Sequence, residues 1–301
     1  MAWGRVLRVS VGPASSVKGD TTGILISDLH VEVKAKRSTG YADGSAEVTI
    51  YNANEDTRKR LNRKGDAVII EAGYEDAGIG TVFVGEVVNA YSSHAGTEWV
   101  TKLKATCGRP VLSHLEQTTI VMSYSNGARL VDVMNELATG IGVILHGAEN
   151  IADIRLPNGL YHAGKIQPLL AKIRAELAVR QMMVSVDFNH MVIIRKGAAS
   201  DYSIVYLDSE SGLMSATPVR SALEYATALN AKKLKVAVMK SDLRPKVSFT
   251  CIADPRIRPN GLVKIVGKAL NGVYLVEDIE YDLDNMGNNW KMKCEATDNA
   301  A

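Results

Sequence analysis

The sequence predicts a β-rich α+β protein that contains two similar small β-barrel modules with an α+β segment inserted between them. Residues 45–107 read as short alternating strands joined by Gly, Asp and Asn turns. A weaker version of the same order recurs at residues 260–294, and the stretch between them changes to helical spacing. We therefore divide the chain into a first module (1–109), an insert (110–200) and a second module (201–301).

The first module shows the two-residue period of half-buried strands. Residues 4–12 and 29–35 alternate apolar with polar side chains, and Val48 with Ile50 and Val68 with Ile70 continue the pattern. Between these strands, Asn54 or Asp56 is a candidate helix cap. The short helical turn that follows carries the basic cluster Arg58, Lys59, Arg60, Arg63 and Lys64. A solvated turn explains this cluster better than a phosphate site, because no aromatic residues are interleaved with it.

The repeat is defined by three strands in the same order. In each copy a strand follows a polar turn, a Gly-led strand with an aromatic residue comes next, and a Trp-led strand with alternating lysines closes the module. The matching stretches are 66–71 with 262–266, 80–84 with 272–276, and 99–104 with 290–293.

The insert has its own helices and hairpin. Ser125 is positioned to cap a helix over 126–139 that ends before Gly140, and Pro168 suits the first turn of a second helix over 168–179. Residues 184–194 read as a β-hairpin. Further on, 233–239 and 246–252 are predicted strands.

Composition excludes several classes of protein. The formal net charge of +2 is too balanced for nucleic-acid binding by bulk charge, and no apolar run is long enough to span a bilayer. The N-terminus lacks the apolar region of a secretory signal. The cysteines Cys107, Cys251 and Cys294 have no metal-binding spacing, so we interpret them as buried free thiols in a reducing compartment.

Catalytic and metal motifs are not found, so we predict no enzyme activity, no cofactor and no metal. The histidines are scattered singly, which favours surface and turn roles. Asp282, Asp284 and Gly287 weakly resemble a calcium loop, but Trp290 and Lys291 stand where an EF-hand needs its later ligands. A hairpin turn is the better interpretation, and whether Asp282 and Asp284 hold a metal stays open.

The order of these motifs resembles baseplate hub proteins of contractile-tailed bacteriophages, the family related to late control D proteins and VgrG. The resemblance rests on VTIYNANEDTRKRL, GDAVIIEAGYE and GTVFVGEVVNA in the first module, and on DPRIRPNGLVKI and NGVYLVEDIEYDLDNMGNNW in the second. It covers nearly the whole chain, and it resides in turn and strand patterns rather than in one diagnostic motif.

The resemblance implies a structural protein of the virion, located in the tail baseplate and assembled in the cytoplasm of a host bacterium. Such hubs are homotrimers whose paired modules make a pseudo-sixfold ring. They join the hexameric tail tube to the trimeric central spike, so the expected partners are tube protein, spike protein and other baseplate proteins. We expect no specific nucleic-acid binding and no membrane insertion.

The repeat gives this assembly a physical rationale, since three chains with two like modules present six similar surfaces. We expect exposed strand edges to build the ring between subunits, at Val82, Val84, Val88, Val273, Val276 and Ile279. Two alternatives remain: a nucleic-acid-binding protein with two OB-like barrels, and a hub that also carries cell-wall hydrolase activity. The host, the particle type, the neighbour of each module, a lytic partner and the role of the insert stay undefined.

Overall fold

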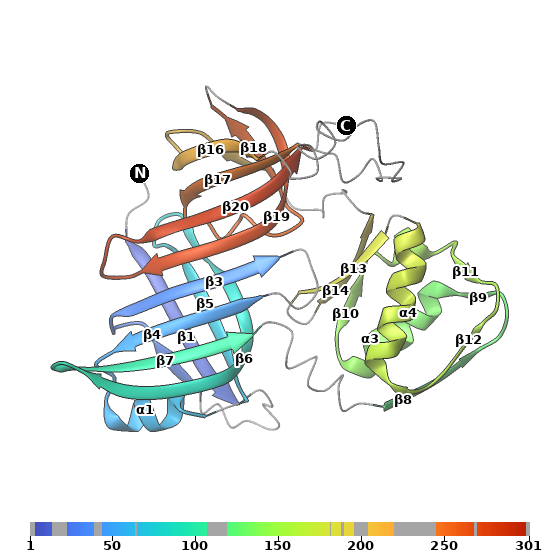
Figure 1. Cartoon of the computed structure of the whole chain (residues 1–301), viewed down its shortest axis with the longest axis horizontal. Helices are drawn as coiled ribbons and strands as arrows, with labels where there is room; N and C mark the ends of the chain where they lie inside the picture. Colours follow the sequence, from blue (N-terminus) through green and yellow to red (C-terminus); the bar gives the residue numbers. More distant parts are fainter. Residues whose placement is uncertain are drawn as a thin grey trace, which may run out of the picture.

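The computed structural model describes residues 4–13, 23–38, 44–63, 65–106, 119–180, 182–187, 190–195, 204–219, 245–267 and 270–298. Within these ranges the strands form one 13-stranded sheet and three small sheets. Figure 1 shows the large sheet beside a smaller part that contains the helices α3 and α4. The chain is therefore β-rich with a helical part, as the sequence predicts.

The N-terminal half of the large sheet contains seven strands that pair in the order β3-β4-β7-β6-β5-β1-β2. They are β1 (Arg5–Pro13), β2 (Ile24–Ile26), β3 (Val31–Ser38), β4 (Ser45–Tyr51), β5 (Asp66–Tyr74), β6 (Gly78–Ala95) and β7 (Glu98–Thr106).

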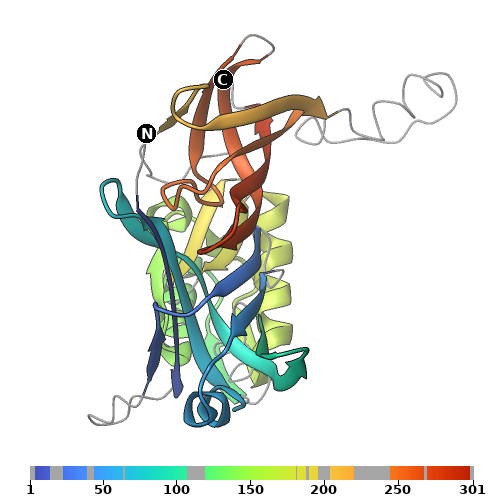
Figure 2. The same ribbon diagram turned by 90° about the vertical axis from the view of Figure 1, so that its left-hand side faces the viewer.

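The C-terminal half contains six strands that pair in the order β16-β17-β20-β19-β18-β15. They are β15 (Val205–Leu207), β16 (Leu213–Val219), β17 (Lys246–Ile252), β18 (Leu262–Val266), β19 (Asn271–Asp284) and β20 (Trp290–Asp298). Figure 2 shows these strands above those of the N-terminal half, along one elongated body.

The two halves share a strand order, since β3-β4-β7-β6-β5 corresponds to β16-β17-β20-β19-β18, whereas the next strand is antiparallel in the N-terminal half (β1) and parallel in the C-terminal half (β15). The long strands β6 and β19 each bend at a bulge, after Val87 and after Val276. At each bulge the carbonyl accepts a hydrogen bond from a residue with positive φ: Gly65 (φ 87°) at Val87 and Asn260 (φ 63°) at Val276. This correspondence makes Val87 the equivalent of Val276, a shift of three residues from the alignment of 80–84 with 272–276 that the sequence suggested.

One strand pair joins the halves. β3 pairs antiparallel with the second part of β19, from Asp278↔Ser38 to Asp284↔Glu32. The described strands therefore form one continuous open sheet, and no pairing among them closes it into a barrel.

Alternation explains why these segments are strands with one dry face. In β3 the side chains of Val31, Val33 and Ala35 are buried, whereas those between them are half-buried or exposed. β19 follows the same rule with Ile279, Tyr281 and Leu283. The buried side chains of both halves belong to one hydrophobic core.

Helix α1 (Glu55–Leu61) covers one end of this core. Asn54 is its N-cap and accepts a hydrogen bond from the Thr57 N–H at 2.8 Å, which confirms one of the two predicted caps. Leu61 is fully buried, and the Arg58 guanidinium lies 3.7 Å from the centre of the Trp99 ring. The basic cluster thus includes a cation–π contact that anchors the helix.

The inserted part has a separate core, whose buried residues run from Met122 to Ile193. Its elements are β8 (Thr119–Tyr124), β9 (Ala128–Arg129), α3 (Leu130–Ile141), β10 (Ile144–His146), the 3-10 helix η1 (Ala148–Ile151), β11 (Arg155–Leu156), β12 (Leu160–Lys165), α4 (Ile166–Val179), β13 (Met182–Asp187) and β14 (His190–Arg195). The predicted boundaries near 109–110 and 200–201 lie outside the described residues, so the division into domains stays a prediction.

The first helix of the insert starts later than predicted. Residues 125–128 form a turn in which the Ala128 N–H bonds the Ser125 carbonyl, and Arg129 is the N-cap of α3. The helix ends at Ile141 with Gly142 (φ 72°) as its C-cap, two residues beyond the predicted stop at Gly140. The hairpin of β13 with β14 is confirmed.

Cys251 and Cys294 are free and buried, as predicted, and burial raises the pKa of the Cys294 thiol well above its usual value. The residues between β19 and β20 connect the two strands of a hairpin, which confirms the preferred interpretation of Asp282 to Gly287. Cys107, Lys64 and the predicted strand at 233–239 lie outside the described residues.

Candidate interaction surface at the junction of the two halves

The outer face of the large sheet carries a row of alternating charges that crosses both halves. The register places Lys104 opposite Glu47, Glu47 opposite Lys34, Lys34 opposite Asp282, and Asp282 opposite Lys291. Five strands, β7, β4, β3, β19 and β20, thus contribute one charge each, with alternating sign. Opposite charges on directly paired residues stabilise the chosen register by about 0.2–1 kcal/mol each.

A second row runs parallel to the first. Lys36 Nζ lies 3.3 Å from Glu280 Oε1, and Glu280 is paired with Lys293 on the next strand. The hydrogen bond and charge of Glu280 raise the pKa of Lys36. Both rows line a groove of about 750 Å³ on this face. The junction face, which we define as these two rows, is a concave polar surface.

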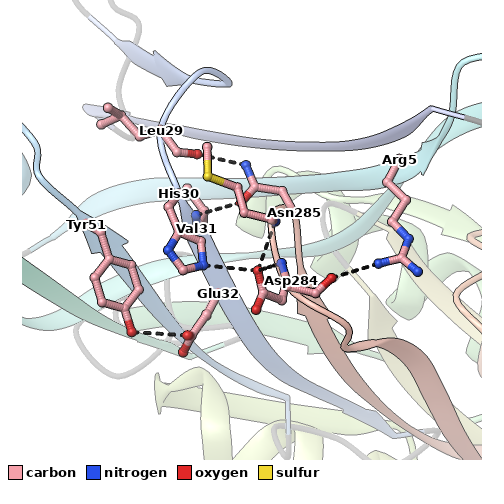
Figure 3. A network of polar contacts seen from close by, with 10 residues as sticks. Arg5, Leu29, His30, Val31, Glu32, Tyr51, Asp284 and Asn285 are labelled. Carbon is pink, nitrogen blue, oxygen red and sulfur yellow. Dashed lines mark hydrogen bonds and ion pairs between the residues drawn. The ribbon is translucent and has the colours of Figure 1, made fainter.

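A compact polar network closes one end of the junction face (Figure 3). His30 precedes β3, Glu32 lies on β3, and Asp284 ends β19, opposite Glu32 in the register. His30 Nε2 lies 3.0 Å from Asp284 Oδ1. The Tyr51 hydroxyl donates to Glu32 Oε1 at 3.0 Å, and the Tyr51 ring stacks on His30 with centroids 4.4 Å apart.

The turn after β19 holds this network in place. Asn285 accepts a hydrogen bond from the Val31 N–H at 2.8 Å and donates one to the Leu29 carbonyl at 2.7 Å, so it fixes the backbone on both sides of His30. Arg5 donates to the Gly287 carbonyl at 3.0 Å. Residues from both ends of the chain therefore build one site, as the sticks in Figure 3 show.

The surroundings shift the pKa values of two groups in the network, Asp284 and Tyr51. Burial raises the pKa of Asp284, but hydrogen bonds from the N–H groups of Gly287 and Met286 and from His30 outweigh it and lower that pKa. Burial, followed by the hydrogen bond to Glu32, raises the pKa of Tyr51. Asp284 is thus ionised and Tyr51 is a neutral donor near neutral pH.

The residues predicted as inter-subunit edges differ in their surroundings. Val82, Val276 and Ile279 are fully buried in the core, so their side chains cannot face another subunit. Ile279 also lies between two paired strands, where it is opposite Cys294 on one side and Arg37 on the other. That part of β19 is therefore no edge of this chain, because β3 already occupies it.

The remaining predicted edge residues are only half-buried. Val84 and Val273 are half-buried, and each pairs with a strand on one side, at Ile69 and at Lys264. Val88 is the residue skipped at the bulge of β6 and lines the groove. A role of these residues between subunits stays a prediction.

The second part of β6 is an open edge. Residues 86–95 pair with β7 on one side. On the other side, the pairing of β6 with β5 stops at Glu86, which is opposite Ala67. Beyond the Val87 bulge, no strand in the described part of the chain pairs with this other side. The end strand β16 likewise pairs only with β17 among the described strands, and five of its seven residues are exposed.

Sequence reasoning missed the His30 network because its members lie about 250 residues apart, as the span from His30 to Asp284 shows. Single histidines carry no spacing signal. The only local sign is that Glu32 lies on the polar face of the alternating strand β3 and that His30 directly precedes this strand. Nothing in the sequence states that the turn after β19 lies beside them.

Solved structures similar to this chain include tail proteins and a component of the type VI secretion system. The 43 kDa tail protein of prophage MuSo2 from Shewanella oneidensis is 11% identical, with a TM-score of 0.62, and covers 99% of this chain and 98% of that one. The tail protein from Neisseria meningitidis MC58 is 10% identical, with a TM-score of 0.62 and coverage of 98% and 97%.

A third similar structure is the E. coli c3393 protein, described as a component of the type VI secretion system with structural similarity to the T4 tail proteins gp27 and gp5. It is 9% identical, with a TM-score of 0.56 and coverage of 90% and 73%. At these identities the likeness shows a shared fold. No family model and no curated protein matches the sequence. Within the described residues, no helix has the length and apolarity that a membrane span requires.

Proposed function

We propose that this chain is a structural baseplate protein of a phage or phage-like tail, which forms a trimeric pseudo-sixfold ring between the hexameric tail tube and the trimeric spike. The fold shared with phage tail proteins over almost the whole chain supports the tail role. The observation that carries the ring is the junction of β3 with β19, because its two counterpart surfaces, β16 and the second part of β6, each lack a strand partner on one side among the described strands.

The counterpart of the β3–β19 pair follows from the shared strand order. β16 corresponds to β3, and the second part of β6 corresponds to the second part of β19. A second chain can therefore place its β16 against β6 of the first, just as β3 lies against β19 within one chain. Because the contact joins different surfaces, repeating it generates a ring when the rotation closes.

The paired residues define the register of this contact. Asp282 is equivalent to Ser93, because each lies six residues after the valine at its bulge. Lys34 is equivalent to Thr217, as the pairing of β3 with β4 and of β16 with β17 shows. Since Asp282 pairs with Lys34, Ser93 should lie opposite Thr217 of the next chain. Both side chains are exposed.

Three chains joined in this way would present six like modules around one axis, which suits a threefold spike on one side and a sixfold tube on the other. The polar junction face would then recur around the ring. Its core-facing side is covered by β1 and β5, so the concave charged side is the one left to line a central channel.

An engineered disulfide between chains tests the proposal. Ala95 and Glu98 close a two-residue β-hairpin. By the alternation of an antiparallel ladder, the backbone N–H and carbonyl of Ser93 then form hydrogen bonds with Val100 on β7 and point away from the open edge. Ser93 and Thr217 would then be a non-hydrogen-bonded pair with Cα atoms about 4.5 Å apart, within the range that a disulfide spans. We expect oxidised S93C/T217C in a Cys107→Ser background to run as a covalent trimer on non-reducing gels.

The controls are the two single variants, Ser93→Cys and Thr217→Cys, in the same background. They should give no covalent trimer, because each ring contact then holds one thiol. Light scattering of the unmodified chain should give the mass of three chains. A strict monomer with no cross-linked product from the double variant would contradict the ring.

A further inference from the structure

The polar network at the junction has the donor set of a metal centre. His30, Glu32 and Asp284 each offer one ligand atom, and these atoms lie within 4.8 Å of one another. All three side chains are half-buried. We propose that His30, Glu32 and Asp284 bind a divalent transition-metal ion, such as Zn²⁺, which ties β3 to the turn after β19. This proposal does not depend on the ring.

The geometry suits coordination. Zinc is tetrahedral and lies about 2.0–2.2 Å from imidazole nitrogen and carboxylate oxygen, so two of its ligand atoms are about 3.4 Å apart. His30 Nε2 and Asp284 Oδ1 are 3.0 Å apart, so a shift of a few tenths of an ångström brings them to that spacing. Glu32 lies opposite Asp284 in the register, and its ligand atom is within 4.8 Å of those of His30 and Asp284, so a small movement brings its carboxylate to the same ion.

The surroundings orient each ligand. Asp284 Oδ1 accepts hydrogen bonds from the N–H groups of Met286 at 2.9 Å and Gly287 at 2.7 Å, which fix the carboxylate. A Cβ at Gly287 would lie 2.0 Å from Asp284 Oδ2, so this position needs glycine to leave room for the carboxylate. Tyr51 holds Glu32 through its hydroxyl and packs on the His30 ring. Such supporting contacts are typical of metal sites, where they set ligand orientation.

The ligand chemistry selects the class of ion. Imidazole suits Zn²⁺, Co²⁺ and Ni²⁺ better than Ca²⁺ or Mg²⁺, which prefer all-oxygen sites. Three protein ligands leave coordination positions for water, and the two carboxylates balance the charge of a divalent ion. The ion would join residues from opposite ends of the chain, so its expected effect is to raise the thermal stability of the folded protein.

The test is titration of the chelator-treated full chain with ZnCl₂, followed by isothermal calorimetry and by thermal unfolding. We expect one ion per chain and a melting temperature that rises with zinc. Cobalt in place of zinc gives a second readout, because a protein-bound Co²⁺ ion absorbs in the visible range. His30→Ala and Glu32→Gln should each weaken binding at least tenfold, and Glu32→Gln preserves the size of the side chain.

The matched controls are His94→Ala and Asp282→Asn, which remove a histidine and a carboxylate elsewhere on the same sheet. They should bind zinc as the unmodified chain does. The proposal is overturned if zinc gives no binding heat and no change in melting temperature. It is equally overturned if His30→Ala and Glu32→Gln bind as tightly as the controls, since the ion would then occupy another place.

Discussion

The strands β6 and β19 hold the same position in the two halves of the sheet, yet they have different neighbours. Each pairs along its first part with the preceding strand, β5 or β18, bends at a bulge and then pairs with a Trp-containing strand, β7 or β20. The second part of β19 is covered by β3, whereas the second part of β6 is open. One chain therefore contains both a paired and an unpaired version of the same strand edge. A neighbouring chain would need to supply a strand equivalent to β3 for the unpaired edge of β6.

The largest expected effect comes from a charge placed on the covered side. Val276 is fully buried, so Val276→Lys should leave an unpaired ammonium group in the core and destabilise the fold by about 3–5 kcal/mol. Val88→Lys changes the half-buried valine that follows Val87, the β6 equivalent of Val276, and should leave the fold intact. Circular dichroism during thermal unfolding distinguishes the two variants; equal melting temperatures would contradict the difference in burial between Val276 and Val88.

The next largest expected effect is a pH dependence of folding stability that arises from β19 and not from β6. Burial raises the pKa of Tyr281 to about 12, whereas the equivalent position on β6 is Ser92, which carries no phenol. The folded state then keeps the phenol protonated when the unfolded chain, with a pKa near 10, has lost the proton. Stability is therefore fully present below pH 10 and falls as pH rises from 10 towards 12, by an amount on the order of 2 kcal/mol.

Tyr281→Phe should make unfolding less dependent on pH across that interval, measured by urea denaturation at pH 9 and at the highest pH where the protein folds. An unchanged slope in the variant would mean that Tyr281 does not carry the effect.

A smaller effect is expected from the charge row on the outer face. Glu47 lies between Lys34 and Lys104, so Glu47→Lys puts three like charges side by side. We expect a loss of about 0.5–1 kcal/mol in low salt that shrinks as salt is added, since these groups are partly exposed. Glu47→Gln is the control and should show a weaker salt response. A loss that is the same at all salt concentrations would point to packing instead of charge.

The smallest perturbation is chemical labelling of the C-terminal half. Cys251 and Cys294 are buried thiols, and burial keeps the Cys294 thiol protonated, so neither should react with a thiol reagent in the folded protein. In a Cys107→Ser background, we expect no labelling in buffer and two labels per chain after denaturation. Rapid labelling in buffer would show that this half opens more readily than its dense core indicates.

The sequence was informative where the signal is local. Alternation along β3, the Asn54 cap of α1 and the turn between β19 and β20 were all predicted, because each depends on neighbouring residues. The predicted start of α3 was wrong because Ser125 is a residue type that commonly caps helices. Gly127 instead adopts a positive φ of 80° in a turn, and Arg129 then pairs with Arg155 before the helix begins.

The contacts between distant segments were not predictable. Alternation shows that Val33 and Leu283 face the core, but it does not reveal that they are opposite each other. The same limit hid the His30 network and the continuity of the sheet, so separate barrels were the natural expectation. A two-residue period fixes which face is buried, whereas the choice of partner depends on packing of the whole chain.

The unequal junctions have a consequence for any ring built from this chain. By the shared strand order, Asp284 corresponds to Ala95 and Glu32 corresponds to Ser215. Contacts within a chain would therefore carry the imidazole and both carboxylates, and contacts between chains would carry small neutral side chains in their place. Such a ring would be sixfold in its backbone and threefold in its chemistry, so an object docking on it could find one of three angular positions from polar side chains alone.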